Sequence, residues 1–298
     1  MRNILLPTDF SQSSINAIFY ALRLMRGTTC TFHFLSIYKA WKYTSGDLML
    51  SCSDDSVYDC LLQENEGKLK KLIENIEKSF PGEDFDFETI SSYNVFTDAI
   101  NNLLEQHHFD FIVMGTDGSS NITEQIFGSH TLRVIRKVNA PLLVIPNGKK
   151  CMIPRNLLLS LNIDTNPEQV SFEALQKLIG NQSFSLDILK IASEDENPEE
   201  EASREQAVKQ LFEIYNPKYH KVSGVPAHQA IQTFVETAKI DFHVLPVKKE
   251  DFLERVFGSQ LAKIIYATKV PLLVLHEAEQ EKPLPPRRRR KRSSAQLS

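Results

Sequence analysis

The feature that most constrains the fold is an internal repeat, because one unit occurs twice along the chain. The run RNILL at residues 2–6 returns as RNLLL at 155–159, an offset of 153. The run APLLVI at 140–145 returns as VPLLVL at 270–275, an offset of 130, so the second copy is shorter inside. A repeat of this length indicates two duplicated domains rather than a solenoid of small units.

Strands and helices are predicted to alternate within each copy. Apolar runs predict strands in the first copy at 2–7, 29–37, 85–90, 109–115 and 142–145. Amphipathic stretches predict helices there at 12–26, 57–79, 98–107 and 128–138. The second copy repeats the strands near 156–161, 184–190, 219–223, 240–246 and 272–275. This order predicts an α/β fold of two tandem, open, parallel five-stranded sheets with helices on both faces.

The repeat and the charge distribution divide the chain into three parts. We expect a first domain at residues 1–148, a second at 149–277, and a disordered basic tail at 278–298. The net charge of the whole chain is −4 at pH 7, and six positive charges lie in the tail at Arg287–Arg292. The net charge of residues 1–286 is therefore −10. Such an acidic body disfavours nucleic acid as a partner, apart from the tail.

The N-terminal sequence and the hydropathy of the chain indicate the cellular compartment of the protein. No apolar run approaches the roughly 20 residues that span a bilayer. The opening apolar run is short, lacks the cleavage site of a secretory segment, and ends at Pro7. We therefore expect a cytoplasmic protein without a membrane partner.

A spaced set of glycines in the first copy suggests a phosphate site. Gly115 and Gly118 follow an apolar strand, and Gly128 and Ser129 open the next helix. Glycine can take positive φ and lets backbone amides approach a ligand, and the N–H groups of a helix N-terminus attract phosphate. Open α/β sheets bind ligands at this carboxyl edge of their strands. The sequence contains neither a Walker A loop nor a GxGxxG motif after its first strand.

The glycine spacing resembles the signature of a known family. The pattern Gly115-x2-Gly118-x9-Gly128-Ser129 matches the nucleotide-binding signature of the universal stress protein family, G-x2-G-x9-G-(S/T), without departure. The run LLPTDFS at 5–11 and the closing strand at 140–145 resemble the two ends of that family's domain. The resemblance covers the first copy and, more loosely, the second. It implies a Rossmann-like fold of the adenine nucleotide alpha hydrolase-like kind.

The resemblance also implies a ligand and a role for each site residue. The ligand would be ATP or AMP, with Mg²⁺ accompanying the triphosphate. Asp9 would meet the ribose or adenine, and Phe34 would contact adenine through main-chain atoms. The phosphates would be held by Gly115, Gly118, Gly128, Ser129, His130 (chiefly through its N–H) and Thr131. From the residue alone, the favoured interpretation of Asp9 is a loop residue that caps the following helix, and the other parts of the motif favour the pocket. Neither a catalytic residue nor a protein metal ligand is assigned.

The second copy has lost most of this pattern. Asn162 stands in the place of the acid, and Pro246 and Lys249 stand in the places of the first two glycines. Proline fixes φ and removes an N–H donor, and lysine carries a long side chain where the backbone should approach a ligand. We expect a degenerate domain that does not bind ATP specifically, while a weak anion site stays open.

Three functions fit these features. The first is an adenine-nucleotide-binding regulator in the stress response, acting on an unknown protein partner. The second is a slow ATPase, although the sequence shows no paired nucleophile and base. The third is an interaction scaffold without nucleotide, against which the intact signature argues. Because family members pair through their last strands, the resemblance implies an intramolecular pseudo-dimer in which 142–145 lies antiparallel to 272–275. A homodimer of whole chains stays open.

Overall fold

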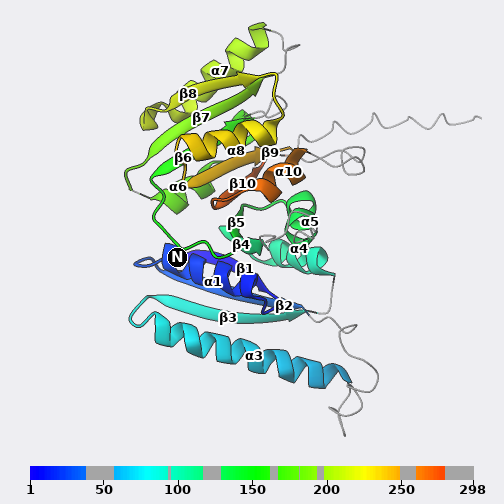
Figure 1. Cartoon of the computed structure of the whole chain (residues 1–298). Helices are drawn as coiled ribbons and strands as arrows, with labels where there is room; N and C mark the ends of the chain where they lie inside the picture. Colours follow the sequence, from blue (N-terminus) through cyan, green and yellow to red (C-terminus); the bar gives the residue numbers. More distant parts are fainter. Residues whose placement is uncertain are drawn as a thin grey trace, which may run out of the picture.

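A computed structural model describes residues 1–37, 57–92, 95–116, 129–161, 167–180, 182–192, 198–248 and 260–278. Strands and helices alternate through both halves of the chain (Figure 1). The strands of the first half are β1 Arg2–Thr8, β2 Cys30–Ile37, β3 Phe85–Ser92, β4 Phe111–Thr116 and β5 Leu142–Pro146. Those of the second are β6 Asn156–Leu161, β7 Ser185–Ala192, β8 Lys218–Ser223, β9 Phe242–Val247 and β10 Leu272–His276.

Helices connect these strands in both halves. The first half has α1 Gln12–Leu24, α3 Val57–Ser79, α4 Phe96–Gln106 and α5 Ser129–Lys137. The second has α6 Glu173–Ile179, α7 Pro198–Phe212, α8 Ala227–Thr237 and α10 Gln260–Ala267, with short 3₁₀ turns η2 Pro167–Gln169 and η3 Glu213–Tyr215. Ser11 caps α1 as its sequence position predicts, because its hydroxyl accepts the Ser14 N–H at 3.3 Å.

All ten strands form one continuous sheet in the order β3-β2-β1-β4-β5-β10-β9-β6-β7-β8. Pairing is parallel within each half, as predicted. The halves meet where β5 and β10 pair antiparallel, with Leu273 opposite Leu143. The pairing of the two last strands that the sequence predicts is therefore present. It covers the edge that each five-stranded sheet would otherwise expose.

The helices cover the sheet in two layers. One apolar layer joins α1 and α3 to α6 and α7, and its fully buried members include Phe32, Phe34 and Phe242. The opposite layer joins α4 and α5 to α8 and α10. Strands covered on both faces must be apolar on both, which explains the uninterrupted hydrophobic runs at β1, β4 and β5.

A repeated aspartate ties the amino ends of the central strands together. The Asp110 carboxylate accepts the Asn3 N–H at 2.8 Å, and its own N–H donates to the Asn3 carbonyl at 2.8 Å. Asp241 makes the same exchange with Asn156, at 3.1 and 3.0 Å. The two halves thus share the same pair of aspartate–asparagine hydrogen bonds, which the apolar pattern of the strands does not predict.

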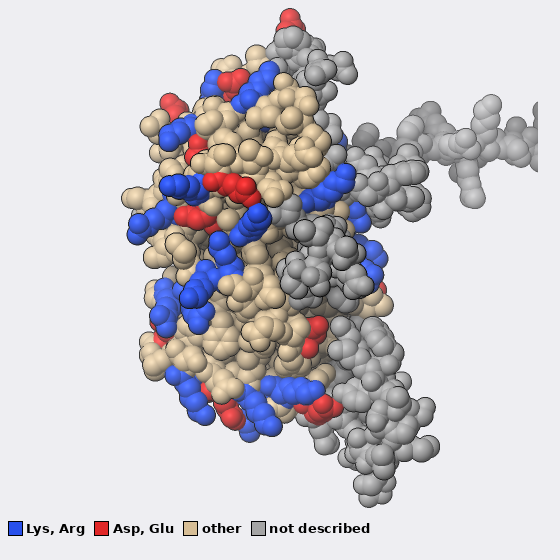
Figure 2. Space-filling model, viewed as in Figure 1, with Lys and Arg blue, Asp and Glu red and all other residues tan. Residues whose placement is uncertain are grey.

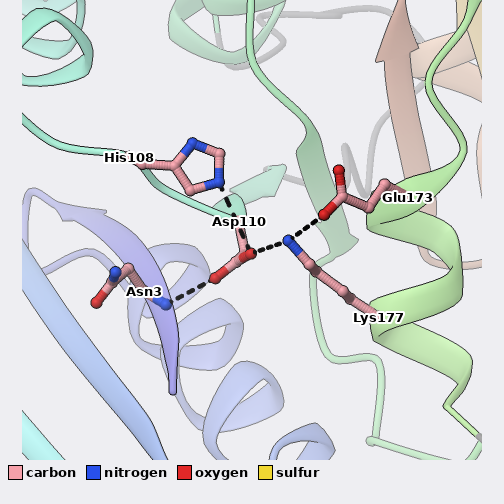
Figure 3. Close-up of polar contacts among 5 residues, drawn as sticks. All are labelled: Asn3, His108, Asp110, Glu173 and Lys177. Carbon is pink, nitrogen blue, oxygen red and sulfur yellow. Dashed lines mark hydrogen bonds and ion pairs between the residues drawn. The ribbon is translucent and has the colours of Figure 1, made fainter.

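One of these two aspartates, Asp110, also joins the two halves. Lys177 of α6 donates to Asp110 Oδ1 at 2.7 Å and to Glu173 at 2.7 Å, while His108 Nε2 lies 4.0 Å from the same oxygen (Figure 3). Burial raises the pKa of Asp110, but the bonds from Lys177 and the Asn3 N–H outweigh it, so that pKa lies below its usual value. A second contact crosses the junction where His276 Nε2 donates to the Ile135 carbonyl at 2.7 Å.

The halves differ in how the first helix follows the first strand. Residues 9–11 join β1 to α1, whereas residues 162–172 separate β6 from the shorter α6. The close approach of α1 to β4 in the first half requires a glycine at position 115, described below. Pro246 stands at that position in β9 and has a Cβ, so the second half lacks the room for the same approach.

Candidate nucleotide site

The candidate site lies at the carboxyl edge of the first half-sheet. The strands β2, β1, β4 and β5 are neighbours in that order and all parallel, so they end side by side. β1 ends at Thr8, β4 at Thr116, and the helix α1 begins at the same edge. Asn16 of α1 fixes this arrangement, because its side-chain amide donates to the Pro146 carbonyl at 3.3 Å.

Gly115 is required for the packing of α1 on β4. A Cβ at this position would lie 2.3 Å from the Ser13 carbonyl oxygen and 2.7 Å from its carbon, closer than any side chain tolerates. Gly115 lies within β4 and is not among the positive-φ residues of the described chain. Of the two properties that make glycine suitable here, positive φ and the lack of a Cβ, Gly115 uses the second. Because glycine has no Cβ, the N-terminal end of α1 can pack directly against β4 at this position.

Thr131 closes the signature segment onto Gly115. The Thr131 hydroxyl, 2% exposed, donates to the Gly115 carbonyl at 3.2 Å. This bond links Gly115, within β4, to the first turn of α5. The two ends of the glycine signature are thereby held together at the carboxyl edge.

The remaining signature residues are described only in part. Gly118 and Gly128 lie outside the described residues. Ser129 and His130 are the first two residues of α5, which places their backbone in the first turn of that helix. The predicted helix start at this point is present, and such a turn offers N–H groups without partners inside the helix.

Asp9 follows the end of β1 and is exposed. Its carboxylate accepts the Ser11 N–H at 3.1 Å, so it shapes the turn that leads into α1. The next residue, Phe10, has φ 61°, and its N–H donates to Thr8 Oγ1 at 3.0 Å. A bulky residue at positive φ is uncommon and is held here by these two side-chain bonds.

Phe34, which is predicted to contact adenine through main-chain atoms, lies within β2. Its side chain is fully buried, and it pairs with Leu6 on one side and Thr89 on the other. Main-chain groups between two paired strands belong to the sheet. The carboxyl end of β2 is instead formed by Ser36 and Ile37.

Ser36 leaves an unpaired hydroxyl at this edge. The residue is 1% exposed, and its Oγ has no hydrogen-bond partner within the described ranges. It pairs in register with Thr8, whose own hydroxyl bonds Ser14 at 3.1 Å. A buried hydroxyl without a partner is costly unless a further group completes it.

The equivalent edge of the second half is apolar. Pro246 and Val247 are buried at the end of β9, and Lys248 is exposed. Asn162, Lys249, Gly258 and Ser259 lie outside the described residues. No cluster of three His, Cys, Asp or Glu side chains able to hold a metal ion occurs in the described part of either half. Among the described helices, none has the length and apolarity needed to cross a membrane.

Sequence reasoning missed three residues of this edge. Ser13, whose carbonyl lies against Gly115, carries no motif, since the contact is made by its main chain. Ser36 and Ile37 end β2 in the run CTFHFLSI, whose polar serine near the end was a usable signal. The predicted strand at 29–37 ends where β2 ends, but its last two residues were not assigned a role at the edge.

The fold is an open, doubled α/β fold, and the candidate site lies at the carboxyl edge of its first half. Comparisons with known proteins identify the family of that half. Residues 1–146 match the model of the universal stress protein family. A universal stress protein of Methanocaldococcus jannaschii is 29% identical over 155 residues, which cover 48% of this chain and 94% of that protein. The chain belongs to the universal stress protein family through this first half.

Solved structures extend the likeness over both halves. A universal stress protein from Archaeoglobus fulgidus superposes with a TM-score of 0.67 at 19% identity, over 93% of this chain and 97% of that one. A functionally unknown protein from Pseudomonas aeruginosa PAO1 gives a TM-score of 0.57 at 14% identity, over 93% of each chain. At these identities the likeness establishes the fold.

Proposed function

We propose that the chain is a regulatory stress-response protein that binds adenine nucleotide, ATP or AMP, in its first half. The observation that carries the proposal is the Thr131–Gly115 hydrogen bond, which holds both ends of the glycine signature at the carboxyl edge. The family match over residues 1–146 supports the same ligand class. Helix N-termini at such an edge bind phosphate.

The described residues at the edge fit a nucleotide. The buried Ser36 hydroxyl lacks a partner in the described part of the chain, and a ribose or base would supply one. Asp9 is exposed beside the start of α1 and can accept a ribose hydroxyl. We propose that Asp9, Gly118, Gly128, Ser129, His130 and Thr131 hold the ligand. Gly115 belongs to the same proposed site and positions α1, and the main-chain contact with adenine that the resemblance assigns to Phe34 of β2 stays part of this proposal.

The bound nucleotide would bring its own chemistry. Its triphosphate supplies the oxygen ligands for Mg²⁺, and the first turn of α5 offers N–H groups to the phosphates. Regulation would follow if the conformation or the partners of the chain depend on the bound nucleotide. The domain limits 1–148 and 149–277 belong to this proposal, with the second half closing the sheet and binding no ATP specifically.

Slow hydrolysis is the second candidate. Asp117 and Glu124 lie in the signature segment and carry carboxylates of the kind that orient water. An interaction scaffold without nucleotide is the third, and the intact glycine spacing opposes it.

The decisive experiment measures what the purified protein carries and what stabilises it. Nucleotide released by denaturation would be identified by chromatography, and melting temperatures recorded with ATP, ADP and AMP. Ligand at a hundredfold excess over its Kd adds about 2.7 kcal/mol to stability. The variant Gly118→Lys, which copies the second half, should lose that gain, whereas Gly67→Ala on the exposed surface of α3 should keep it.

The outcome separates the three candidates. If no adenine nucleotide co-purifies and none shifts the melting temperature, the nucleotide proposal is wrong and the scaffold stands. Phosphate release that the Gly118→Lys variant abolishes would favour the ATPase. Equal and negligible phosphate release by the parent protein and the variant would exclude the ATPase and favour the nucleotide-binding regulator.

A further inference from the structure

The segment that joins the halves exposes two adjacent apolar side chains. Residues 147–155 connect β5 to β6 and include Met152 and Ile153, which are 63% and 58% exposed. Among the large apolar residues exposed in the described chain, these are the two that are adjacent in sequence. Isolated exposed apolar residues are ordinary on protein surfaces, but a neighbouring pair beside charges of one sign is less so.

Basic residues lie on both sides of this pair in the sequence. Lys150 and Arg155 are exposed in the same segment, and Lys149 is half-buried. Figure 2 shows Lys and Arg side chains gathered at the junction of the halves, on the face that carries α1 in Figure 1. We call the residues Arg23, Arg26, Lys149, Lys150, Met152, Ile153 and Arg155 the linker surface.

The end of α1 brings two further cations to this surface. Burial raises the pKa of the Cys151 thiol to about 11, and the charges of Arg23 and Arg26 act against that rise, so both arginines act electrostatically on this linker residue. Arg26 lies over the ring of Phe80 at 5.0 Å, and both arginines are exposed. The linker surface therefore combines an apolar pair with cations from two separate segments.

The carboxylates described at this junction are already engaged. Glu83 lies 3.6 Å from Arg26 and accepts the Gly27 N–H at 2.8 Å. Asp241 accepts the backbone N–H groups of Arg155 and Asn156. Neither reverses the positive sign of the surface.

We propose that the linker surface contacts an anionic phospholipid bilayer, with Met152 and Ile153 entering the interface and the cations of this surface meeting lipid phosphates. Apolar side chains flanked by Lys and Arg are the chemistry of peripheral membrane contact. The expectation of no membrane partner rested on the lack of a spanning segment, which peripheral contact does not need. The proposal is independent of the proposed nucleotide site.

The charge of the rest of the chain sets the strength of this contact. Residues 1–286 carry −10, so an anionic membrane repels the body and attracts only the linker surface and the tail. Binding should therefore be weak, reversible and sharply reduced by salt. A neutral bilayer should bind far less.

The test is co-sedimentation of the full chain with phosphatidylcholine vesicles, with and without phosphatidylserine, at low and at physiological salt. All proteins would carry Gln at the six basic positions of Arg287–Arg292, which removes the contribution of the tail. The variant Met152→Ser with Ile153→Ser removes the apolar pair. The matched control is Ile214→Ser, which removes an apolar side chain 81% exposed in η3, away from the linker surface.

The expected result is binding that depends on phosphatidylserine and falls on the order of tenfold in the double serine variant. The Ile214→Ser control should bind as the parent does. Neutralising Lys149, Lys150 and Arg155 to Gln should abolish the dependence on phosphatidylserine. Equal binding by the double variant and the control, or no binding at low salt, overturns the proposal. Binding to soluble polyglutamate without binding to vesicles would also overturn it and assign the surface to an acidic protein segment.

Discussion

The Lys177 ammonium group of the second half lies 2.7 Å from Asp110 Oδ1 of the first half. Asp110 is 7% exposed and also holds the start of β1 through the Asn3 N–H. The pair is thus the described ion pair that joins the two halves beside the β5–β10 pairing. Its cation comes from α6, a helix that has no counterpart of equal length in the first half.

Lys177→Met should destabilise the chain, because it leaves the buried Asp110 carboxylate without its cation. Lys177 is partly exposed, so we expect a loss of about 1–3 kcal/mol rather than the larger cost of a fully buried pair. Urea unfolding measures it. Lys209→Met, which breaks an exposed pair with Glu205 within α7, should cost less than about 0.5 kcal/mol. Equal costs for both variants would show that Asp110 needs no cation.

Gly115→Ala should destabilise the first half and weaken nucleotide binding together. The added Cβ must displace the Ser13 carbonyl, from which it would lie 2.3 Å, and overpacking of this kind costs about 1–3 kcal/mol. Gly67→Ala adds the same methyl group in α3, where nothing lies within 4 Å, and should stabilise the chain by about 0.5–1 kcal/mol. Unfolding curves and nucleotide titrations would be compared for both. If Gly115→Ala changed neither the stability nor the nucleotide affinity, α1 would be shown to move away from the added Cβ without cost.

Thr131→Val should lower stability by about 0.5–1.5 kcal/mol, because the Gly115 carbonyl loses its donor. Thr131→Ser keeps the hydroxyl and should retain most of the nucleotide affinity. Thr237→Val serves as a control, since that hydroxyl also donates to a backbone carbonyl but is exposed. Nucleotide affinity by calorimetry is the readout. Identical nucleotide affinities for the Val and Ser variants would show that the Thr131 hydroxyl does not contribute to ligand binding.

Stability should fall in mild acid because of His243. Burial lowers the pKa of this histidine from 6.5 to about 3 in the folded chain, and its Nε2 pairs with Ser160 Oγ at 2.7 Å. Between these two pKa values the unfolded chain binds one more proton than the folded chain. Stability therefore declines as pH falls through this window, by up to about 1.4 kcal/mol per unit.

The double variant His243→Leu with Ser160→Ala removes that titration. At the corresponding places the first half carries the apolar residues Ile112 and Pro7, so an apolar pair is compatible with the fold. Urea midpoints at pH 7 and pH 5 should differ less in the variant than in the parent. The same difference in both would assign the acid effect to other groups.

The sequence predicted most of the fold because both copies show the same alternation. All ten strands lie where apolar runs place them, and α3 matches its predicted bounds of 57–79. The antiparallel meeting of 142–145 with 272–275 was also predicted, from family resemblance. Burial on both faces makes such strands conspicuous in a sequence.

The site was less predictable, for reasons that lie in main-chain contacts. Glycine at position 115 was recognised as necessary, but the group that excludes its Cβ is a carbonyl oxygen, which no residue type encodes. The end of β2 at Ile37 agrees with the predicted strand at 29–37, but an apolar run does not show which of its main-chain groups face a ligand. The Asp110–Lys177 contact joins residues 67 apart in sequence and has no local pattern.

The pairing of β5 with β10 has a consequence for synthesis of the chain. β5 is complete once residue 146 is made, whereas its partner β10 at 272–276 is the last of the described strands to be synthesised. Until then the nascent first half exposes an apolar edge that neighbouring nascent chains could add to. Carrying the partner strand on the same polypeptide gives it a high effective concentration, which favours correct closure over exchange between chains. Polysomes translating this protein are thus where misassembly would first be found.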